Sequence, residues 1–120
     1  TAGFRVVGHG NGFRIENRMP GADANPYLAF AVTIAAGLAG IRENLDCGAD
    51  YRGNAYTDKS LRALPSSVDE AVGMLRSSAV AKAALGEDVV EFYAHTGELE
   101  VEAFNNSITD WEKVRYFERI

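Results

Sequence analysis

The sequence has few residues of the kinds on which disulfides, metal clusters and nucleic-acid surfaces depend. Its single cysteine, Cys47, excludes an internal disulfide and indicates a reducing, cytoplasmic location. Its two histidines, His9 and His95, have no second ligand at metal-binding spacing. Basic residues number 12 against 17 acidic ones, and the net charge of −5 gives no support for a nucleic-acid partner.

A membrane-spanning run and a phosphate-binding loop are missing as well. The longest largely apolar run, Tyr27 to Ile41, has 15 residues. A helix needs about 20 to cross a bilayer, so we expect no membrane partner. The stretch Gly8–Gly12 lacks the Lys-Ser/Thr pair of a phosphate loop, and no helix is expected directly after it. Its glycines are interpreted as residues of a tight reversal.

The residues that are present predict one α+β domain. Two short strands, Phe4–Val7 and Phe13–Met19, flank the glycines and predict an antiparallel β-hairpin. Asn25 and Pro26 are typical of a helix start, and the apolar run after them predicts a helix buried on most sides. We expect four or five helices behind the hairpin. The chain then divides into a hairpin (1–19), a buried helix (25–46), an irregular loop (47–65) and C-terminal helices (66–120).

The C-terminal helices carry clear start and stop signals. We expect an N-cap at Ser66 or Ser67 and a final helix capped by Thr109 with Glu112 three residues on. The glutamates of a long helix from Glu87 predict a solvated acidic face. In the last helix, Trp111 and Phe117 are expected to anchor a core.

Charged side chains alternate along the second strand. Arg14, Glu16 and Arg18 fall on one face, because successive side chains of a strand point to opposite sides. One interpretation is that Glu16 forms a plain salt bridge with both arginines. The other is a site in which Glu16 binds a hard cation and the arginines face phosphate or carboxylate. The spacing alone leaves both interpretations open.

The same stretch resembles a known family. The runs R-I-E-N-R-M-P-G-A-D-A-N-P-Y-L-A-F-A from Arg14 and A-G-L-A-G-I from Ala36 are similar to the C-terminal part of the glutamine synthetase catalytic domain. Near the end, T-D-W-E and R-Y-F resemble the closing motif of that family, and L-P-S-S and A-L-G-E stand where two further motifs occur. The similarity covers essentially the whole chain. The strand and its loop look more like the γ-glutamyl ligases for polyamines, ethanolamine or other amines than like the ammonia-using enzymes.

The resemblance implies a reaction and a role for each charged residue of the hairpin. It implies an ATP-dependent ligase that phosphorylates glutamate and lets ammonia or an amine displace the phosphate, with Mg²⁺ or Mn²⁺ as the metal. Glu16 would be a metal ligand, and Arg18 a catalytic arginine that binds the glutamate carboxylate or the acyl phosphate. Arg14 and Arg5 would bind nucleotide phosphates, with Arg5 also near the substrate. The resemblance also implies a homo-oligomer.

Enzymes of this family are several times longer than the chain. The chain therefore resembles a C-terminal piece of the catalytic domain, which we expect to be inactive alone because most of the site is missing. An alternative is a non-catalytic remnant that acts as a self-associating or assembly module.

Overall fold

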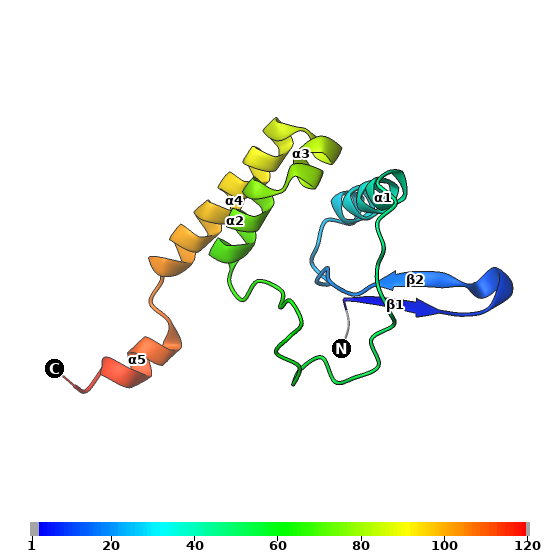
Figure 1. Cartoon of the computed structure of the whole chain (residues 1–120). Helices are drawn as coiled ribbons and strands as arrows, with labels where there is room; N and C mark the ends of the chain where they lie inside the picture. Colours follow the sequence, from blue (N-terminus) through cyan, green and yellow to red (C-terminus); the bar gives the residue numbers. More distant parts are fainter. Residues whose placement is uncertain (1–2, 120) are drawn as a thin grey trace. The chain divides into compact units, whose positions relative to one another are not determined.

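The computed structural model describes residues 3–119 and confirms the α+β class. Among these residues it has one two-stranded antiparallel sheet and five α-helices (Figure 1). The chain divides into two compact units, which meet in sequence between Leu64 and Pro65. Unit 1 carries the hairpin and the first helix, and unit 2 carries the other four helices. None of the described helices combines the length and hydropathy needed to cross a membrane.

The hairpin of unit 1 forms where the alternating pattern predicted it. Strand β1 (Phe4–Val7) pairs with β2 (Arg14–Asn17), and Arg5 lies opposite Glu16 in the register. A short 3₁₀ turn, η1 (Gly10–Gly12), closes the connection. Gly8 has a positive φ of 87°, and a Cβ there would collide with the Gly12 carbonyl group. The reversal therefore requires glycine at this position.

Helix α1 (Pro26–Arg42) begins as its sequence predicts. The Asn25 side chain accepts hydrogen bonds from the backbone N–H groups of Tyr27 and Leu28, at 3.0 and 3.3 Å, and Pro26 occupies the first turn. The structure differs from the expectation of a buried helix, because no residue of α1 is buried. Two strands of four residues each are too small to cover a 17-residue helix.

The segment between α1 and α2 has no regular element and is held together by side-chain hydrogen bonds. Tyr51 Oη donates to Asp58 Oδ2 at 3.1 Å. Asp58 Oδ1 in turn accepts from the backbone N–H and the hydroxyl of Ser60, at 3.0 and 2.6 Å. These bonds to Ser60, followed by the one from Tyr51, hold the pKa of Asp58 below its usual value. The loop is irregular, but hydrogen bonds within it link Tyr51, Asp58 and Ser60.

Unit 2 consists of helices with well-formed caps. They are α2 (Val68–Ser77), α3 (Ala79–Leu85), α4 (Glu87–Asn105) and α5 (Asp110–Tyr116). Ser67 caps α2, Gly86 with a φ of 87° separates α3 from α4, and Thr109 and Glu112 form the predicted capping box of α5. The caps therefore confirm the boundaries read from the sequence.

The core of unit 2 lies where α2 and α3 pack on α4. Its buried side chains are Val72, Ala81, Val90 and Ala94. Gly97 lets α4 approach α2 closely, because a Cβ at Gly97 would lie 2.5 Å from Val72 Cγ2. This contact accounts for a glycine inside a helix of 19 residues, where it would otherwise weaken the element.

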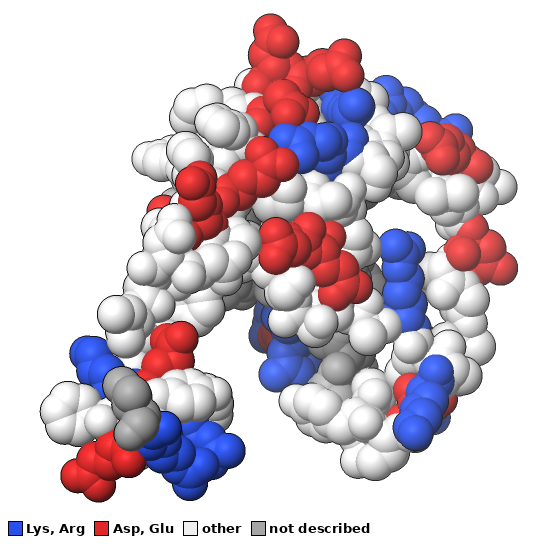
Figure 2. All heavy atoms as spheres, turned by 90° about the vertical axis from the view of Figure 1, so that its left-hand side faces the viewer, with Lys and Arg blue, Asp and Glu red and all other residues white. Residues whose placement is uncertain are grey.

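Arg76 ties α2 to α4 through two glutamates. Its Nε donates to both carboxylate oxygens of Glu91 at 3.0 Å, and its Nη1 donates to Glu98 Oε1 at 2.6 Å. These hydrogen bonds hold the pKa values of Glu91 and Glu98 below the usual value of 4.5. Two glutamates of the predicted solvated face thus have a partner. Figure 2 shows acidic and basic side chains on the surface that it draws.

The prediction that Trp111 and Phe117 anchor a core is wrong. They are 66% and 83% exposed, and α5 buries none of its residues. The turn at Asn106–Ser107 separates α5 from α4, and the Trp111 ring makes its aromatic contact within α5, edge-on to Tyr116 with 6.0 Å between ring centroids. The aromatic pair is local to the last helix.

We expect Gly97→Ala to destabilise unit 2, although alanine is the better helix former. The new Cβ would lie 2.5 Å from Val72 Cγ2, and overpacking of this kind costs about 1–3 kcal/mol. Gly73→Ala is the matched control, because nothing lies within 4 Å of the Cβ added there. It should stabilise the unit by roughly 0.5–1 kcal/mol. Urea unfolding measures both values, and effects of the same sign would contradict the close packing of α4 on α2.

We expect the Arg76 cluster to make unit 2 sensitive to acid. Because Glu91 and Glu98 have depressed pKa values in the folded state, their contribution is fully present above about pH 4.5 and is lost as the pH falls through those values. Arg76→Met removes the guanidinium and should therefore reduce the loss of stability of unit 2 at low pH.

The loss of stability at low pH is measured by thermal unfolding between about pH 6 and pH 2. This pH range spans the titration of paired carboxylates. Lys113→Met is the control, since it breaks a surface pair with Asp110 in α5. If Arg76→Met and Lys113→Met reduced the loss of stability at low pH equally, a specific role for Arg76 would be contradicted.

Candidate functional site

Three of the residues predicted to form the site, Arg5, Arg14 and Glu16, lie on one face of the hairpin. Arg14 and Glu16 alternate on β2, and the register places Arg5 of β1 directly opposite Glu16. Glu16 Oε1 lies 3.1 Å from Arg14 Nη2, and Glu16 Oε2 lies 3.6 Å from Arg5 Nη1. One carboxylate therefore lies between two guanidinium groups that come from different strands.

The opposite face of β2 is turned toward α1. Ile15 and Asn17 line a hollow with Phe30 and Thr33, and Asn17 Nδ2 donates to Thr33 Oγ1 at 3.0 Å. Asn17 Oδ1 also accepts from the Met19 backbone N–H at 3.1 Å. Since side chains alternate across a strand, this contact directs Arg14 and Glu16 away from the helix. Asn17 thus links β2 to both α1 and the backbone of Met19.

Arg18 lies just beyond the end of β2 and extends the pairing. Its backbone N–H donates to the Gly3 carbonyl at 2.8 Å. With Arg5, it lines a hollow of about 530 Å³ whose other wall is the loop segment 47–53. Arg5 therefore belongs to both groups: it pairs with Glu16 and it borders the hollow with Arg18. The structure thus brings Arg5, Glu16 and Arg14 into contact, and it places Arg18 with Arg5 at the hollow, beyond the opposite end of β2 from Arg14.

The described residues contribute a single carboxylate to this face. Among residues 3–119, no three His, Cys, Asp or Glu side chains are grouped so that they could hold a metal ion. A hard divalent cation takes six or more oxygen ligands. Glu16, one-third exposed, has the donor chemistry for one of them, and the remaining ligands would have to come from water, substrate phosphates or other parts of the protein.

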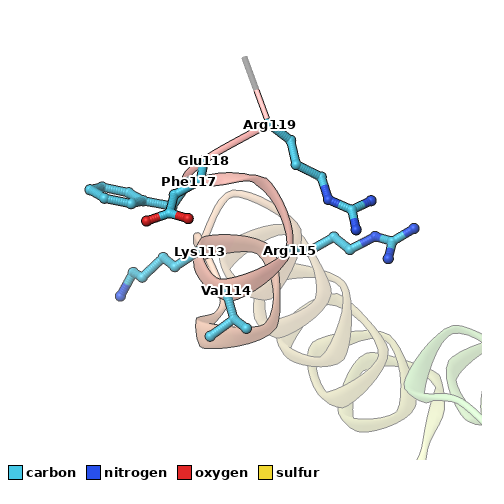
Figure 3. A pocket seen from close by; sticks show the side chains of 6 residues that line it. All are labelled: Lys113, Val114, Arg115, Phe117, Glu118 and Arg119. Atoms are coloured by element: carbon cyan, nitrogen blue, oxygen red, sulfur yellow. The ribbon is translucent and has the colours of Figure 1, made fainter.

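A second hollow, on the last helix, lacks these features. It is lined by Lys113, Val114, Arg115, Phe117, Glu118 and Arg119. In Figure 3 Arg115 and Arg119 extend to one side of the helix, whereas Lys113, Phe117 and Glu118 extend to the other. The charged hairpin, in which two guanidinium groups contact one carboxylate, is the better candidate.

Comparisons with known proteins identify the family of the chain. Residues 1–116 match the family described as glutamine synthetase, catalytic domain. A gamma-glutamylethanolamide synthetase of Streptomyces coelicolor is 46% identical over 120 residues, which are all of this chain and 26% of that protein. A glutamate–isopropylamine ligase of a Pseudomonas species is 37% identical over 117 residues, 96% of this chain and 26% of its own length.

A third relative has a similar identity and coverage. A glutamine synthetase of Methanosarcina mazei is 37% identical over 114 residues, which cover 89% of this chain and 26% of that protein. Because the family match spans almost the whole sequence, the chain belongs to the glutamine synthetase catalytic-domain family. It spans about a quarter of the length of these curated relatives.

We expect Thr33→Val to loosen β2 on α1. The change removes the acceptor of the Asn17 amide while keeping the shape of the side chain, and the loss of about 1 kcal/mol should speed amide exchange in β2 roughly fivefold. Thr96→Val is the control, because Thr96, like Thr33, donates to the carbonyl four residues earlier, but from within α4. Unchanged exchange in β2 of Thr33→Val would show that the contact does not hold the hairpin.

Proposed function

We propose that the chain is part of an ATP-dependent carboxylate–amine ligase that forms a γ-glutamyl amide. In this reaction a carboxylate oxygen of glutamate attacks the γ-phosphorus of ATP, and ADP leaves. The amine nitrogen then attacks the acyl carbon of the γ-glutamyl phosphate, phosphate leaves with the bonding electrons of the C–O bond, and the nitrogen releases one proton to give the amide. The observation that supports the proposal is the placement of Glu16 between Arg5 and Arg14 on the hairpin face, beside Arg18.

The residues of this face suit a reaction in which anionic oxygens gather. Arg14 and Arg5 would bind nucleotide phosphates, because a guanidinium presents several donors in a fixed planar fork. Arg18 would bind the glutamate carboxylate or the acyl phosphate, and Arg5 borders the same hollow. These roles rest on the family resemblance together with the positions of the side chains.

Glu16 would hold a divalent cation, Mg²⁺ or Mn²⁺, and a bound cation would supply charge neutralisation for the phosphates. The carboxylate that binds a cation can no longer pair as closely with Arg5 and Arg14. Both guanidinium groups would then be available to phosphate oxygens. The ion pairs found on the hairpin are thus compatible with the metal role as well as with a plain salt bridge.

The acceptor in this proposal is an amine. The two relatives named above for ethanolamide and isopropylamine products support it. Ammonia is the alternative, supported by the glutamine synthetase among the relatives. The complete protein would act as a cytoplasmic homo-oligomer.

A second candidate is a self-associating module without catalytic activity. It is supported by the apolar side chains that α1 exposes, among them Phe30, Ile34 and Leu38 at 67%, 62% and 54%. Sedimentation of the 120-residue chain with and without Ile34→Glu tests it. Concentration-dependent association that Ile34→Glu abolishes would support this candidate, and a monomer at all concentrations would exclude it.

We expect Glu16→Ala in the complete protein to lower kcat/KM for amine-dependent ADP formation by at least about 100-fold, because a bound metal ligand is lost. Glu43→Ala is the matched control, since it removes the same charge at the exposed C-cap of α1. ADP release is measured with glutamate and ethanolamine, isopropylamine or ammonia in turn. Equal activity of the two variants, or ADP formation that needs no glutamate, would contradict the proposal.

A further inference from the structure

The hollow beside β1 carries more positive charge than the hairpin alone supplies. It is lined by Arg5 and Arg18 from the hairpin and by Arg52 from the loop, with Asp50 as the one carboxylate among its lining residues. Its volume of about 530 Å³ lies within the range of ligand pockets. Arg5 also pairs with Glu16 at 3.6 Å, so three guanidinium groups face two carboxylates, Asp50 and Glu16. The remaining positive charge favours an anionic ligand.

The residues on both sides of Arg52 have contacts within the loop. The preceding residue, Tyr51, donates its hydroxyl to Asp58. The following residue, Gly53, lies against the Tyr51 ring, because a Cβ at Gly53 would lie 2.5 Å from Tyr51 Oη. The Tyr51 side chain therefore links the two neighbours of Arg52, and Arg52 itself lines the hollow.

The guanidinium of Arg52 has only a weak partner in the loop. Arg52 Nη2 lies 3.6 Å from Asp50 Oδ2, and the two side chains are 86% and 83% exposed. Exposed ion pairs at this separation contribute little stability, so an anion with two or more charges can displace Asp50 from Arg52. Asp50 thus competes with such a ligand for the same guanidinium.

We propose that Arg52 is an anion-binding residue of this hollow, where it acts with Arg5 and Arg18 on a phosphate or pyrophosphate group. Arg52 supplies a third guanidinium from the loop, and Asp50 weakens binding by occupying it. That the physiological anion is a phosphate of the nucleotide or of the acyl phosphate rests on the proposed function. The site itself is defined by the lining residues and by the Tyr51–Asp58 and Gly53 contacts.

The test is a calorimetric titration of the 120-residue chain with inorganic pyrophosphate in the absence of metal. Arg52→Ala should weaken binding about tenfold, since a hydrogen bond between charged groups is lost. Arg62→Ala is the matched control: it removes the same charge from the same loop, but Arg62 lines a different hollow. Asp50→Asn should strengthen binding a few-fold, because it releases Arg52.

Two results would overturn the proposal. One is that the unsubstituted chain does not bind pyrophosphate. The other is that Arg52→Ala and Arg62→Ala weaken binding equally, which would show that only net charge matters. The titration contains no metal and does not require Glu16 as a ligand. A failure of the ligase proposal, seen as full activity of Glu16→Ala, is therefore distinguishable from a failure of the Arg52 site.

Discussion

The antiparallel register of the hairpin is the constraint on which the charged face of unit 1 depends: it places the Glu16 carboxylate between the guanidinium groups of Arg5, across the strand, and Arg14, on the same strand. The contact needs the antiparallel register, because only that register places Arg5 opposite Glu16. The register in turn needs the glycine turn, and Gly8 tolerates no side chain there. An exposed ion pair contributes little stability. Its importance is that it gathers opposite charges at one place.

The two faces of the hairpin have different contacts: one packs toward α1 and the other carries the charged side chains. Asn17 and Ile15 turn toward α1, so the charged face is left open to ligands. The loop of residues 47–53 then adds a wall to the hollow that Arg5 and Arg18 border. Charged groups from the hairpin and the loop are thus brought together by the strand register, which pairs Arg5 with Glu16, and by a loop whose Tyr51 is hydrogen-bonded to Asp58.

The sequence predicted the features that depend on neighbouring residues. Asn25 and Thr109 were recognisable as caps because capping needs only a few adjacent residues. The link from Arg76 to Glu91 and Glu98 was not predictable, since its partners lie 15 and 22 residues away and depend on how α2 packs on α4. The apolar composition of α1 indicated burial, yet the structure leaves its residues uncovered. An apolar composition predicts that a helix will be covered, but it does not identify the surface that covers it.

The central claim is that Glu16 is a metal ligand and more than a salt-bridge partner. Titration of the 120-residue chain with Mn²⁺ and ATP, followed by paramagnetic broadening of backbone amide signals, tests it most directly, because even weak binding broadens nearby signals. We expect the first loss of signal at Glu16 and at Arg5 across the strand. Loss that begins instead at the exposed glutamates of α4, Glu100 and Glu102, with β2 unaffected, would contradict the claim.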